Sequence, residues 1–316
     1  MGRRLAVAKA YCSSANLGPG FDIFGLSLNM YADTVKVEPT EKKSIVINMK
    51  GPYRDAVPLL PSKNSAGPPA MELLRRAQAK KGLKVTIKKN VPPGLGLGSS
   101  GATAAACTKA VDSLLETGLS DDEMVQVASL GEGAIAETPH MDNVAASLLG
   151  GFVIVYGRDP AHVVSIRPSS RLAVAIVTPR VQLPKAKTKM ARSLVPDRVE
   201  LSKAVLSIGW ASALAVGFAR GDIGLIGEGM NDEIVEPHRE RLVPGYRSVK
   251  RAALSAGAAG VAISGAGPSI IAVVDRAQSD ARRVAKTMAR EFARNNVQAQ
   301  YFITGPSLGA RIVRSA

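Results

Sequence analysis

Alternating hydrophobic and polar residues mark the first third of the chain. Segments 35–38, 44–48 and 84–88 follow the period of two that is typical of strands with one buried and one exposed face. The pattern predicts an antiparallel or mixed sheet. The proline- and glycine-rich stretch 51–69 between two of these strands predicts an irregular loop.

Helical patterns follow downstream. Residues 99–115 are rich in alanine, and residues 121–130 follow Ser120, a favoured N-cap residue, with Glu123 placed to complete a capping box. We therefore expect two consecutive helices, with a strand at 152–156 after them.

The second half mixes strands and helices in an order typical of an α+β protein. We expect strands at 172–177, 261–264, 270–274 and 298–303, and helices at about 198–219, 244–256 and 278–293. The start of this second unit predicts two domains, residues 1–170 and residues 171–316.

Two apolar runs raise the question of a membrane span. Glycines and a proline interrupt the uncharged run 252–274, so two buried elements joined by a glycine turn explain it better than one span. The run 204–219 is shorter than the roughly 18 residues of a span and predicts a core helix. Because Lys9 interrupts the apolar start of the chain, we expect no secretory leader and a cytoplasmic protein.

Composition and charge narrow the class of protein. The 316 residues suffice for about two domains, and 46% hydrophobic residues exclude intrinsic disorder. Two cysteines, Cys12 and Cys107, are too few for a disulfide framework or a thiolate zinc site, so buried free thiols are expected. The net charge of +15 favours anionic partners without choosing among them. We expect the basic residues of the helix at 278–293 to form a solvated face.

The stretch 91–101, Val-Pro-Pro-Gly-Leu-Gly-Leu-Gly-Ser-Ser-Gly, is the most informative motif. Its glycines let the backbone fold tightly and approach a ligand, and the helix that follows presents free N–H groups and a positive dipole end. The motif therefore predicts an anion cradle suited to phosphate. The hydroxyls of Ser99 and Ser100 can bind a phosphate oxygen or Mg²⁺.

Other phosphate-binding motifs fit this stretch less well. No lysine precedes Ser99, so the Walker A pattern is absent. Gly96, Gly98 and Gly101 match G-x-G-x-x-G, but an amphipathic strand and two prolines precede them, unlike the loop of a dinucleotide-binding fold. No H-R-D or D-F-G sequence follows, which excludes a protein kinase.

Two further glycine loops lie at 16–22 and 264–269. Singly they indicate tight turns. Together with 91–101 they resemble the three motifs of the GHMP kinases, a superfamily that includes galactokinase, mevalonate kinase and homoserine kinase. Segments that resemble the homoserine kinase branch in particular are 13–22, 139–144, 149–152 and 236–239, and the resemblance covers most of the chain.

This resemblance implies a fold and an activity. The fold would pair an N-terminal domain like the second domain of ribosomal protein S5 with a ferredoxin-like C-terminal α/β sandwich. The activity would be ATP-dependent phosphorylation of the side-chain hydroxyl of L-homoserine, with Mg²⁺, in threonine biosynthesis. We further expect a homodimer with neither a nucleic-acid nor a membrane partner.

The resemblance also assigns residues to roles. The implied ATP site comprises Pro92, Pro93, Gly94, Leu95, Gly96, Leu97, Gly98, Ser99, Ser100, Gly101, Ala102, Gly265 and Gly267, with Asn64 and Lys89 as further nucleotide contacts. The implied homoserine pocket comprises Asn16, Asp22, His140, Asp142, Asn143, Thr188, Arg192, Arg239 and Gly265.

Three of the implied residues would be catalytic. Ser100 and Glu132 would hold Mg²⁺, and Asn143 would lie near the reacting hydroxyl. No residue marks a general base, so catalysis by transition-state stabilisation is expected. Two other functions stay open at this point: a GHMP kinase for another small alcohol, and an RNA-binding protein on an S5-like fold, which the positive charge would suit.

Overall fold

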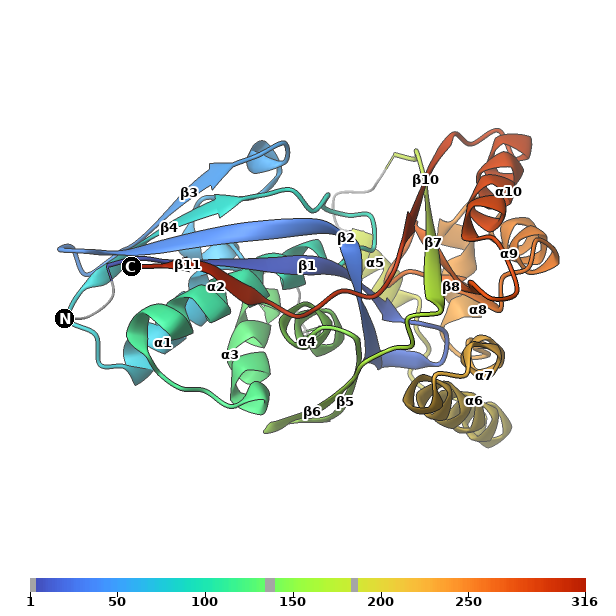
Figure 1. The fold of residues 1–316 in the computed structure, drawn as a ribbon, viewed down its shortest axis with the longest axis horizontal. Helices are drawn as coiled ribbons and strands as arrows, with labels where there is room; N and C mark the ends of the chain where they lie inside the picture. The colour runs from blue at the N-terminus through green and yellow to red at the C-terminus, as the bar shows by residue number, and fades with distance from the viewer. Residues whose placement is uncertain (1–3, 134–139, 183–186) are drawn as a thin grey trace.

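The first of two sheets occupies one end of the molecule (Figure 1). The computed structural model describes residues 4–133, 140–182 and 187–316. The strands of this sheet are β1 (Ala6–Asn16), β2 (Gly20–Thr40), β3 (Ile45–Lys50), β4 (Gly82–Lys88), β5 (Phe152–Arg158), β6 (Ala161–Ile166) and β11 (Arg311–Ser315). Their order is β11-β1-β2-β4-β3, and β5 pairs with both β2 and β6. All pairs are antiparallel except β3 with β4, so the predicted mixed sheet is confirmed.

Helices cover one face of this sheet (Figure 1). They are α1 (Gly67–Arg76), α2 (Ser99–Leu115), α3 (Asp121–Gly133) and α4 (Met141–Leu149). The alternation read from the sequence places Val85 and Ile87 of β4 in the core under the helices, while Lys84 and Lys88 are exposed. The helices therefore bury the hydrophobic face of β4 and leave its lysines exposed.

Local sequence signals located some of these helices and missed others. The helix at 99–115 has the predicted bounds, and the predicted capping box forms, with Ser120 N–H donating to Glu123 Oε2 over 3.0 Å. The stretch 51–69 is not wholly irregular, because it holds two short 3-10 turns and the start of α1. That helix begins with Gly-Pro-Pro. These residues are typical of loops, although proline is also accepted in the first turn of a helix, so the sequence alone did not reveal the helix start.

The second sheet has the strand order of a ferredoxin-like fold. Its strands are β7 (Leu172–Pro179), β8 (Gly260–Ile263), β9 (Ile270–Asp275) and β10 (Ala299–Thr304), antiparallel in the order β10-β7-β9-β8. One face packs on α9 (Tyr246–Ser255) and α10 (Ala281–Arg294), and the other joins the core of the first domain. The predicted α+β class and the predicted ferredoxin-like C-terminal sandwich are confirmed.

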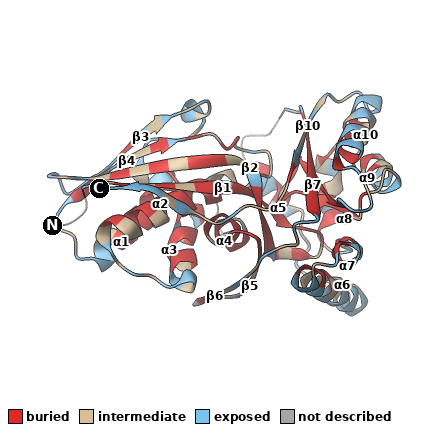
Figure 2. Ribbon diagram, viewed as in Figure 1, coloured by how far each residue is buried: buried red, intermediate tan, exposed pale blue. Residues whose placement is uncertain are grey.

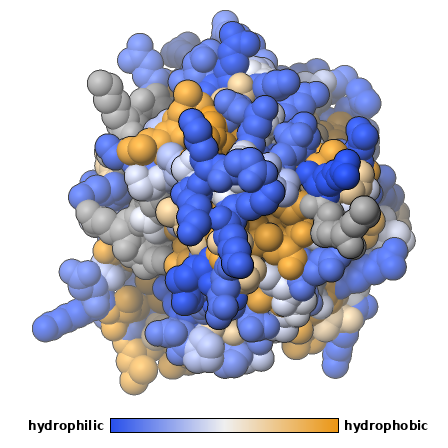
Figure 3. All heavy atoms as spheres, turned by 90° about the vertical axis from the view of Figure 1, so that its left-hand side faces the viewer, coloured by the Kyte–Doolittle hydropathy of each residue, from blue (hydrophilic) through white to orange (hydrophobic). Residues whose placement is uncertain are grey.

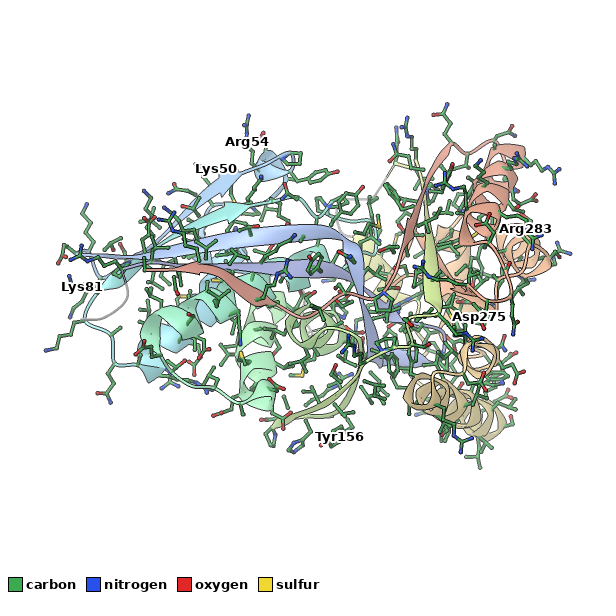
Figure 4. The ribbon with its side chains drawn as sticks, in the orientation of Figure 1. Lys50, Arg54, Lys81, Tyr156, Asp275 and Arg283 are labelled. Carbon is green, nitrogen blue, oxygen red and sulfur yellow. The ribbon has the colours of Figure 1, made fainter. Side chains whose placement is uncertain are left out.

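Two further predictions for this half are confirmed. The apolar run 252–274 forms the end of α9 and the buried hairpin β8–β9, joined by the glycine loop 264–269. The basic residues of α10 face solvent, as the outward-pointing Arg283 illustrates (Figure 4). Cys12 and Cys107 are buried and free, as expected.

In the described part of the chain between β7 and α9 lie one long helix and three short ones. They are α5 (Lys187–Ser193), α6 (Leu201–Arg220), α7 (Ile223–Glu228) and α8 (Glu236–Arg239). The prediction that 204–219 is a core helix is wrong, because α6 lies at the periphery with most of its residues exposed (Figure 2). By length and composition α6 could cross a membrane, yet only 22% of its apolar window is buried in the protein.

The last strand returns to the first sheet. Strand β11 pairs with β1, and Leu5 and Ala316 exchange backbone hydrogen bonds of 2.9 and 3.1 Å. Hydrophilic side chains dominate the surface at this end of the molecule (Figure 3). After residue 304 the chain leaves the second sheet and returns to the first. A single boundary near residue 170 does not describe this path, and the boundary stays a prediction.

Candidate functional site

The three glycine loops meet where the two sheets join. The first loop is the turn between β1 and β2, the second leads into α2, and the third links β8 to β9. Ser264 Oγ donates to the Gly96 carbonyl over 2.7 Å and lies 2.9 Å from Ser14 Oγ. Asn16 Nδ2 donates to the Gly265 carbonyl over 2.9 Å. Segments 250 residues apart in sequence thus form one loop cluster.

Close packing explains why the second loop needs glycine. A Cβ on Gly96 would lie 2.2 Å from the Ser264 carbonyl oxygen, and one on Gly98 would lie 2.1 Å from Ser13 Oγ. Both glycines have positive φ, +75° and +60°, a conformation that L side chains rarely adopt. At Gly96 and Gly98 the loop backbone therefore packs directly against Ser264 of the third loop and Ser13 of β1, with no room for a side chain.

The start of α2 is left free to bind an anion. Gly98 is its N-cap residue, and no side chain caps the helix there. The first backbone N–H groups of a helix have no partner inside the helix, and together they carry a partial positive charge. The predicted phosphate cradle is thus a loop of glycines ending in an uncapped helix N-terminus.

A buried ion pair holds the first turn of α2 in place. Lys89 pairs with Asp33 and donates to the Ser99 carbonyl over 2.6 Å and to Thr103 Oγ1 over 2.8 Å. Asp33 Oδ1 also accepts the backbone N–H of Val91 over 2.9 Å. Burial lowers the pKa of Lys89, and the Asp33 charge opposes that shift. Lys89 reaches the cavity wall with its ammonium already bound by the protein.

A second buried lysine, which the sequence gave no reason to select, joins two of the loops. Lys187 at the start of α5 donates to the Gly94 carbonyl over 2.7 Å and also to the Gly267 carbonyl. Burial, reinforced by the charge of Arg239, lowers the pKa of Lys187 to about 7. The three residues that follow it, Thr188, Lys189 and Met190, are exposed, so no periodic signal marks Lys187.

Glu132 presents an unpaired oxygen to the cavity. Its side chain is 4% exposed, and Oε1 has no hydrogen-bond partner within the described chain. Burial raises the pKa of Glu132, while a hydrogen bond with Ser100 and the charges of His140 and Lys89 lower it. A buried carboxylate oxygen beside a serine hydroxyl is suited to a hard divalent cation. No cluster of three or more acidic, His or Cys side chains suited to a metal occurs among the described residues.

A charged cluster around Asp22 and His140 also borders the cavity. His140 Nδ1 is 3.5 Å from Asp22 Oδ1, and Arg192 Nη2 is 2.8 Å from Asp22 Oδ2. Burial alone would raise the pKa of Asp22, but the hydrogen bonds from His140 and Arg192 hold it well below its usual range. Burial would lower the pKa of His140, but Asp22, Asp142 and Glu132 raise it. His140 Nε2 and Arg192 Nη1 are buried without partners in the described chain, so each is available to a polar group of a ligand.

Asp142 and Asn143 begin α4 beside this cluster. Burial raises the pKa of Asp142 to about 6. Its Oδ1 accepts the backbone N–H of Asn143 over 2.6 Å and the Asn143 side-chain amide over 3.2 Å. The other end of that amide, Oδ1, accepts Ser13 Oγ over 3.0 Å. The Asn143 side chain is therefore held in one orientation from both ends.

Two arginines flank Phe21 at the mouth of the cluster. The Arg192 and Arg239 guanidinium carbons lie 5.3 and 4.8 Å from the centroid of the ring. Arg239 is buried and donates to the Ala191 carbonyl over 3.0 Å. Burial lowers the pKa of Arg239 to about 10. Thr188 is exposed on the same side of the cavity.

A cavity of about 520 Å³ connects the loops with this cluster. Predicted site residues that line it are Asn16, Asp22, Lys89, Pro93, Gly94, Gly96, Leu97, Gly98, Ser99, Ser100, Glu132, His140, Asp142, Asn143, Thr188, Arg239 and Gly265. Predicted residues that do not line it are Asn64, Pro92, Leu95, Gly101, Ala102, Arg192 and Gly267. Residue 139 of one motif lies outside the described residues.

Asn64 is committed elsewhere in the fold. Its Nδ2 donates to the Pro58 carbonyl over 2.7 Å, and its Oδ1 accepts the backbone N–H of Ala66 over 3.0 Å. The cavity wall near it is formed instead by Ala56, Val57, Pro58, Lys63 and Ser65. Asn64 therefore shapes this wall rather than facing the cavity.

Comparison with known proteins places these features in a family. The model of the GHMP kinases N terminal domain matches residues 66–151, and that of the GHMP kinases C terminal domain matches residues 214–299. A homoserine kinase of Sulfurisphaera tokodaii is 40% identical over 278 residues, 88% of this chain and 89% of the relative. One of Thermoplasma volcanium is 37% identical over 96% of this chain and 94% of the relative. The crystal structure of homoserine kinase from Cytophaga hutchinsonii superposes with a TM-score of 0.89 at 32% identity, covering 98% of both chains.

Proposed function

Because this chain belongs to the homoserine kinase family of the GHMP kinases, we propose that its cavity carries γ-phosphate from ATP to the side-chain hydroxyl of L-homoserine. The product is O-phospho-L-homoserine, a precursor in threonine biosynthesis. The observation that carries this proposal is the junction, in one cavity, of an uncapped glycine-loop helix with Asp22 and His140, which Arg192 contacts from behind the cavity lining. One end is suited to phosphates and the other to an amino acid.

The nucleotide lies with its phosphates along residues 92–102. The free N–H groups at the start of α2 and of the loop bind the phosphate oxygens. Gly265 and Gly267 keep the third loop close to the second, through Ser264 and Lys187. Ala56, Val57 and Pro58 offer an apolar wall for the base, with Asn64 behind them and Lys89 beneath the loop.

Mg²⁺ fits between Ser100 and Glu132. The unpaired Oε1 of Glu132 supports this position. A buried carboxylate without a hydrogen-bond donor costs free energy, and a bound cation would offset that cost. Two protein ligands suffice for Mg²⁺, which completes its shell with waters and phosphate oxygens. When bound, the ion neutralises charge that develops between the phosphates.

The amino acid lies against the charged cluster. Arg239 and Thr188, which line the cavity, suit its carboxylate, with the unpartnered Nη1 of Arg192 beside them. Asp22, held ionised by His140 and Arg192, suits its ammonium, with Asn16, Asp142 and Gly265 close by. A zwitterion is therefore met by opposite charges on adjoining parts of one wall.

The transfer proceeds without a dedicated base. Asp142 already accepts two hydrogen bonds from Asn143, and Asp22 is too weak a base to take a hydroxyl proton. The hydroxyl oxygen bonds to the γ-phosphorus, the bond from that phosphorus to the bridging oxygen breaks, and the hydroxyl proton passes to a phosphoryl oxygen. Asn143 holds the hydroxyl in place, and the helix dipole and the cation stabilise the charge.

A coupled assay of ADP release, started with L-homoserine and Mg²⁺, tests this function. We expect turnover that depends on both, and a phosphomonoester product in the phosphorus NMR spectrum. A panel of small alcohols, including mevalonate and galactose, addresses the alternative of another GHMP kinase. Higher kcat/KM for any of these than for L-homoserine would overturn the proposed substrate. Salt-dependent RNA binding without turnover would instead favour the RNA-binding alternative.

We further propose a cytoplasmic enzyme that forms a homodimer and uses neither nucleic acid nor membrane as a partner. Its domains would be residues 1–170 and 171–316. The strand composition of the two sheets supports this division, except that β11 contributes to the first.

A further inference from the structure

Helix α8 is too short to hold its own place in the fold. It has four residues, and isolated helices shorter than about 12 residues are marginal in water. Glu236 and Arg239, three residues apart, are both buried, whereas the two residues between them are exposed. The side-chain contacts of α8 therefore decide where Arg239 lies in the cavity wall.

The start of α8 is fixed only locally. Asp232 Oδ2 accepts the backbone N–H of Glu236 over 2.8 Å, and its Oδ1 accepts that of Ile234 over 2.7 Å. These bonds satisfy N–H groups at the helix start, but they stay within four residues of the chain. The link to other elements comes from the Glu236 side chain.

The Glu236 carboxylate joins α8 to two other elements. Its Oε1 accepts a hydrogen bond from Lys250 Nζ of α9 over 2.8 Å, and its Oε2 accepts the backbone N–H of Ile263, the last residue of β8, over 3.1 Å. Figure 1 shows α8, α9 and β8 together at one end of the molecule. The side chain is buried, so both oxygens need the partners that they have.

The bond to Ile263 is made at an open edge. Strand β8 is at the edge of the second sheet, so its outward N–H groups have no strand partner. The next N–H, that of Ser264, points inward and donates to the Ser269 carbonyl over 2.9 Å. Glu236 therefore holds β8 at the residue that precedes the third glycine loop.

Arg239 contacts the same loop two residues further on. Its Nη1 donates to the Gly265 carbonyl over 3.4 Å, and its Nε donates to the Ala191 carbonyl over 3.0 Å. One turn of helix thus bonds segment 263–265 at both ends, through Glu236 at one and Arg239 at the other. Loss of the first bond would free the second to shift.

We propose that Glu236 is a positioning residue for the amino-acid substrate, because it fixes Arg239 relative to the third glycine loop. Glu236 does not line the cavity, so it acts through Arg239, which does. The inference rests on the proposed function, in which Arg239 contacts the carboxylate of L-homoserine. An ion pair that only stabilised the fold would leave the substrate affinity unchanged.

Steady-state kinetics of Glu236→Ala test this role. We expect KM for L-homoserine to rise about 10-fold or more, because the carboxylate contact is misplaced. KM for ATP should stay within about 2-fold, since Lys187 holds the phosphate loop from α5. Glu236→Gln keeps an oxygen for the Ile263 N–H and should keep KM for L-homoserine within about 3-fold of the wild type. Lys250→Met removes only the ion pair and should do the same.

Glu240→Ala is the matched control. Glu240 pairs with Arg247 of the same helix α9 over 2.6 Å, and its side chain has no hydrogen bond with β8 in the described chain. We expect Glu240→Ala to lower the thermal midpoint while leaving KM for L-homoserine unchanged. Loss of stability and loss of substrate affinity are thereby measured separately.

A double variant shows whether Glu236 acts through Arg239. In an Arg239→Ala background, Glu236→Ala should change kcat/KM for L-homoserine by less than about 2-fold, because the group that it positions is gone. Should Glu236→Ala not fold, Glu236→Asp, which keeps the charge on a side chain one methylene shorter, should give the same rise in KM.

The outcomes separate this inference from the proposed function. An unchanged KM in Glu236→Ala or Glu236→Asp, or losses that add in the double variant, overturns the positioning role, while wild-type turnover of L-homoserine upholds the function. A wild type without homoserine-dependent ADP release overturns both.

Discussion

The Lys187 ammonium donates a hydrogen bond to the Gly94 carbonyl oxygen over 2.7 Å, and this contact fastens α5 to the phosphate loop. The same helix carries Thr188 and Arg192, which we assign to the amino-acid substrate. The Lys187 ammonium therefore links α5 to the phosphate loop, and it also donates to the Gly267 carbonyl of the third loop. Lys187 is a positioning residue, since it acts through the groups that it holds.

Lys187→Met should lower kcat by about 10-fold to 100-fold, because misplaced reacting groups lose the benefit of proximity. With a pKa of about 7, the wild-type ammonium is lost above neutrality, so kcat/KM should fall above pH 7 in the wild type and stay flat in the variant. Steady-state kinetics from pH 6 to 9 measure both. Lys286→Met on the exposed face of α10 is the control, and the same pH limb in Lys187→Met would contradict the assignment.

Asn143→Ala should reduce kcat by about 10²-fold, the usual effect of removing one positioned polar group from a transition state. Hydrogen bonds with Ser13 and Asp142 fix the orientation of its amide, so the lower kcat would come from the loss of a positioned group. Steady-state assays with saturating ATP and L-homoserine measure it. Asn231→Ala, at an exposed position, should leave kcat unchanged, and wild-type kcat in Asn143→Ala would show that the hydroxyl lies elsewhere.

Glu132→Gln should remove the Mg²⁺-dependent activity while leaving the apo protein as stable as the wild type or more so. The raised pKa of Glu132 shows that burial disfavours its charge, so a neutral isostere relieves a cost in the absence of the cation. Thermal denaturation with and without Mg²⁺-ATP gives the readout. The wild type should gain thermal stability with Mg²⁺-ATP, and the variant should gain far less. An equal gain in both would place the cation elsewhere.

His140 makes the stability depend on pH in a defined direction. Its pKa is raised in the folded state, so its contribution is complete below the unfolded value of 6.5 and is lost as the pH rises through the folded value. His140→Gln should therefore cost about 1 kcal/mol at pH 6 and less at pH 9. Urea denaturation of both proteins at the two pH values measures the difference. A cost that grows with pH would mean that His140 is neutral in the fold.

Gly96→Ala and Gly118→Ala separate crowding from backbone strain. Both glycines have positive φ, but a Cβ on Gly96 meets the Ser264 carbonyl at 2.2 Å, whereas one on Gly118 meets nothing within 4 Å. Gly118→Ala should cost about 1 to 2 kcal/mol, the strain of the left-handed conformation. Gly96→Ala should cost more and weaken ATP binding, as calorimetry and denaturation would show. Equal losses would mean that the loops do not depend on this contact.

The sequence predicted those features whose causes are local. Helix α2 has its predicted bounds because Gly98 starts it and Glu116, in the left-handed conformation, ends it. The capping box at Ser120 and the alternation of β4 are equally short-range. Resemblance to a family then located most cavity residues, including His140 and Asp142, whose roles stay predictions.

Features that depend on distant contacts were missed. Hydropathy cannot tell whether an apolar helix packs inside its own chain, so α6 was misassigned to the core. Lys187 is buried because the loops at Gly94 and Gly267 fold over it, and nothing in its neighbours signals this. Asn64 lies next to residues that line the cavity, but its side-chain amide hydrogen-bonds to the backbone of Pro58 and Ala66.

The pairing of β11 with β1 makes the first domain discontinuous in the chain. During synthesis the ribosome must complete the entire ferredoxin-like unit before the edge strand of the first sheet exists. Until then β1 presents an open edge, the kind that invites pairing with other chains. Removal of residues 311–315 would reopen that edge in the finished protein, far along the chain from the strand that it exposes.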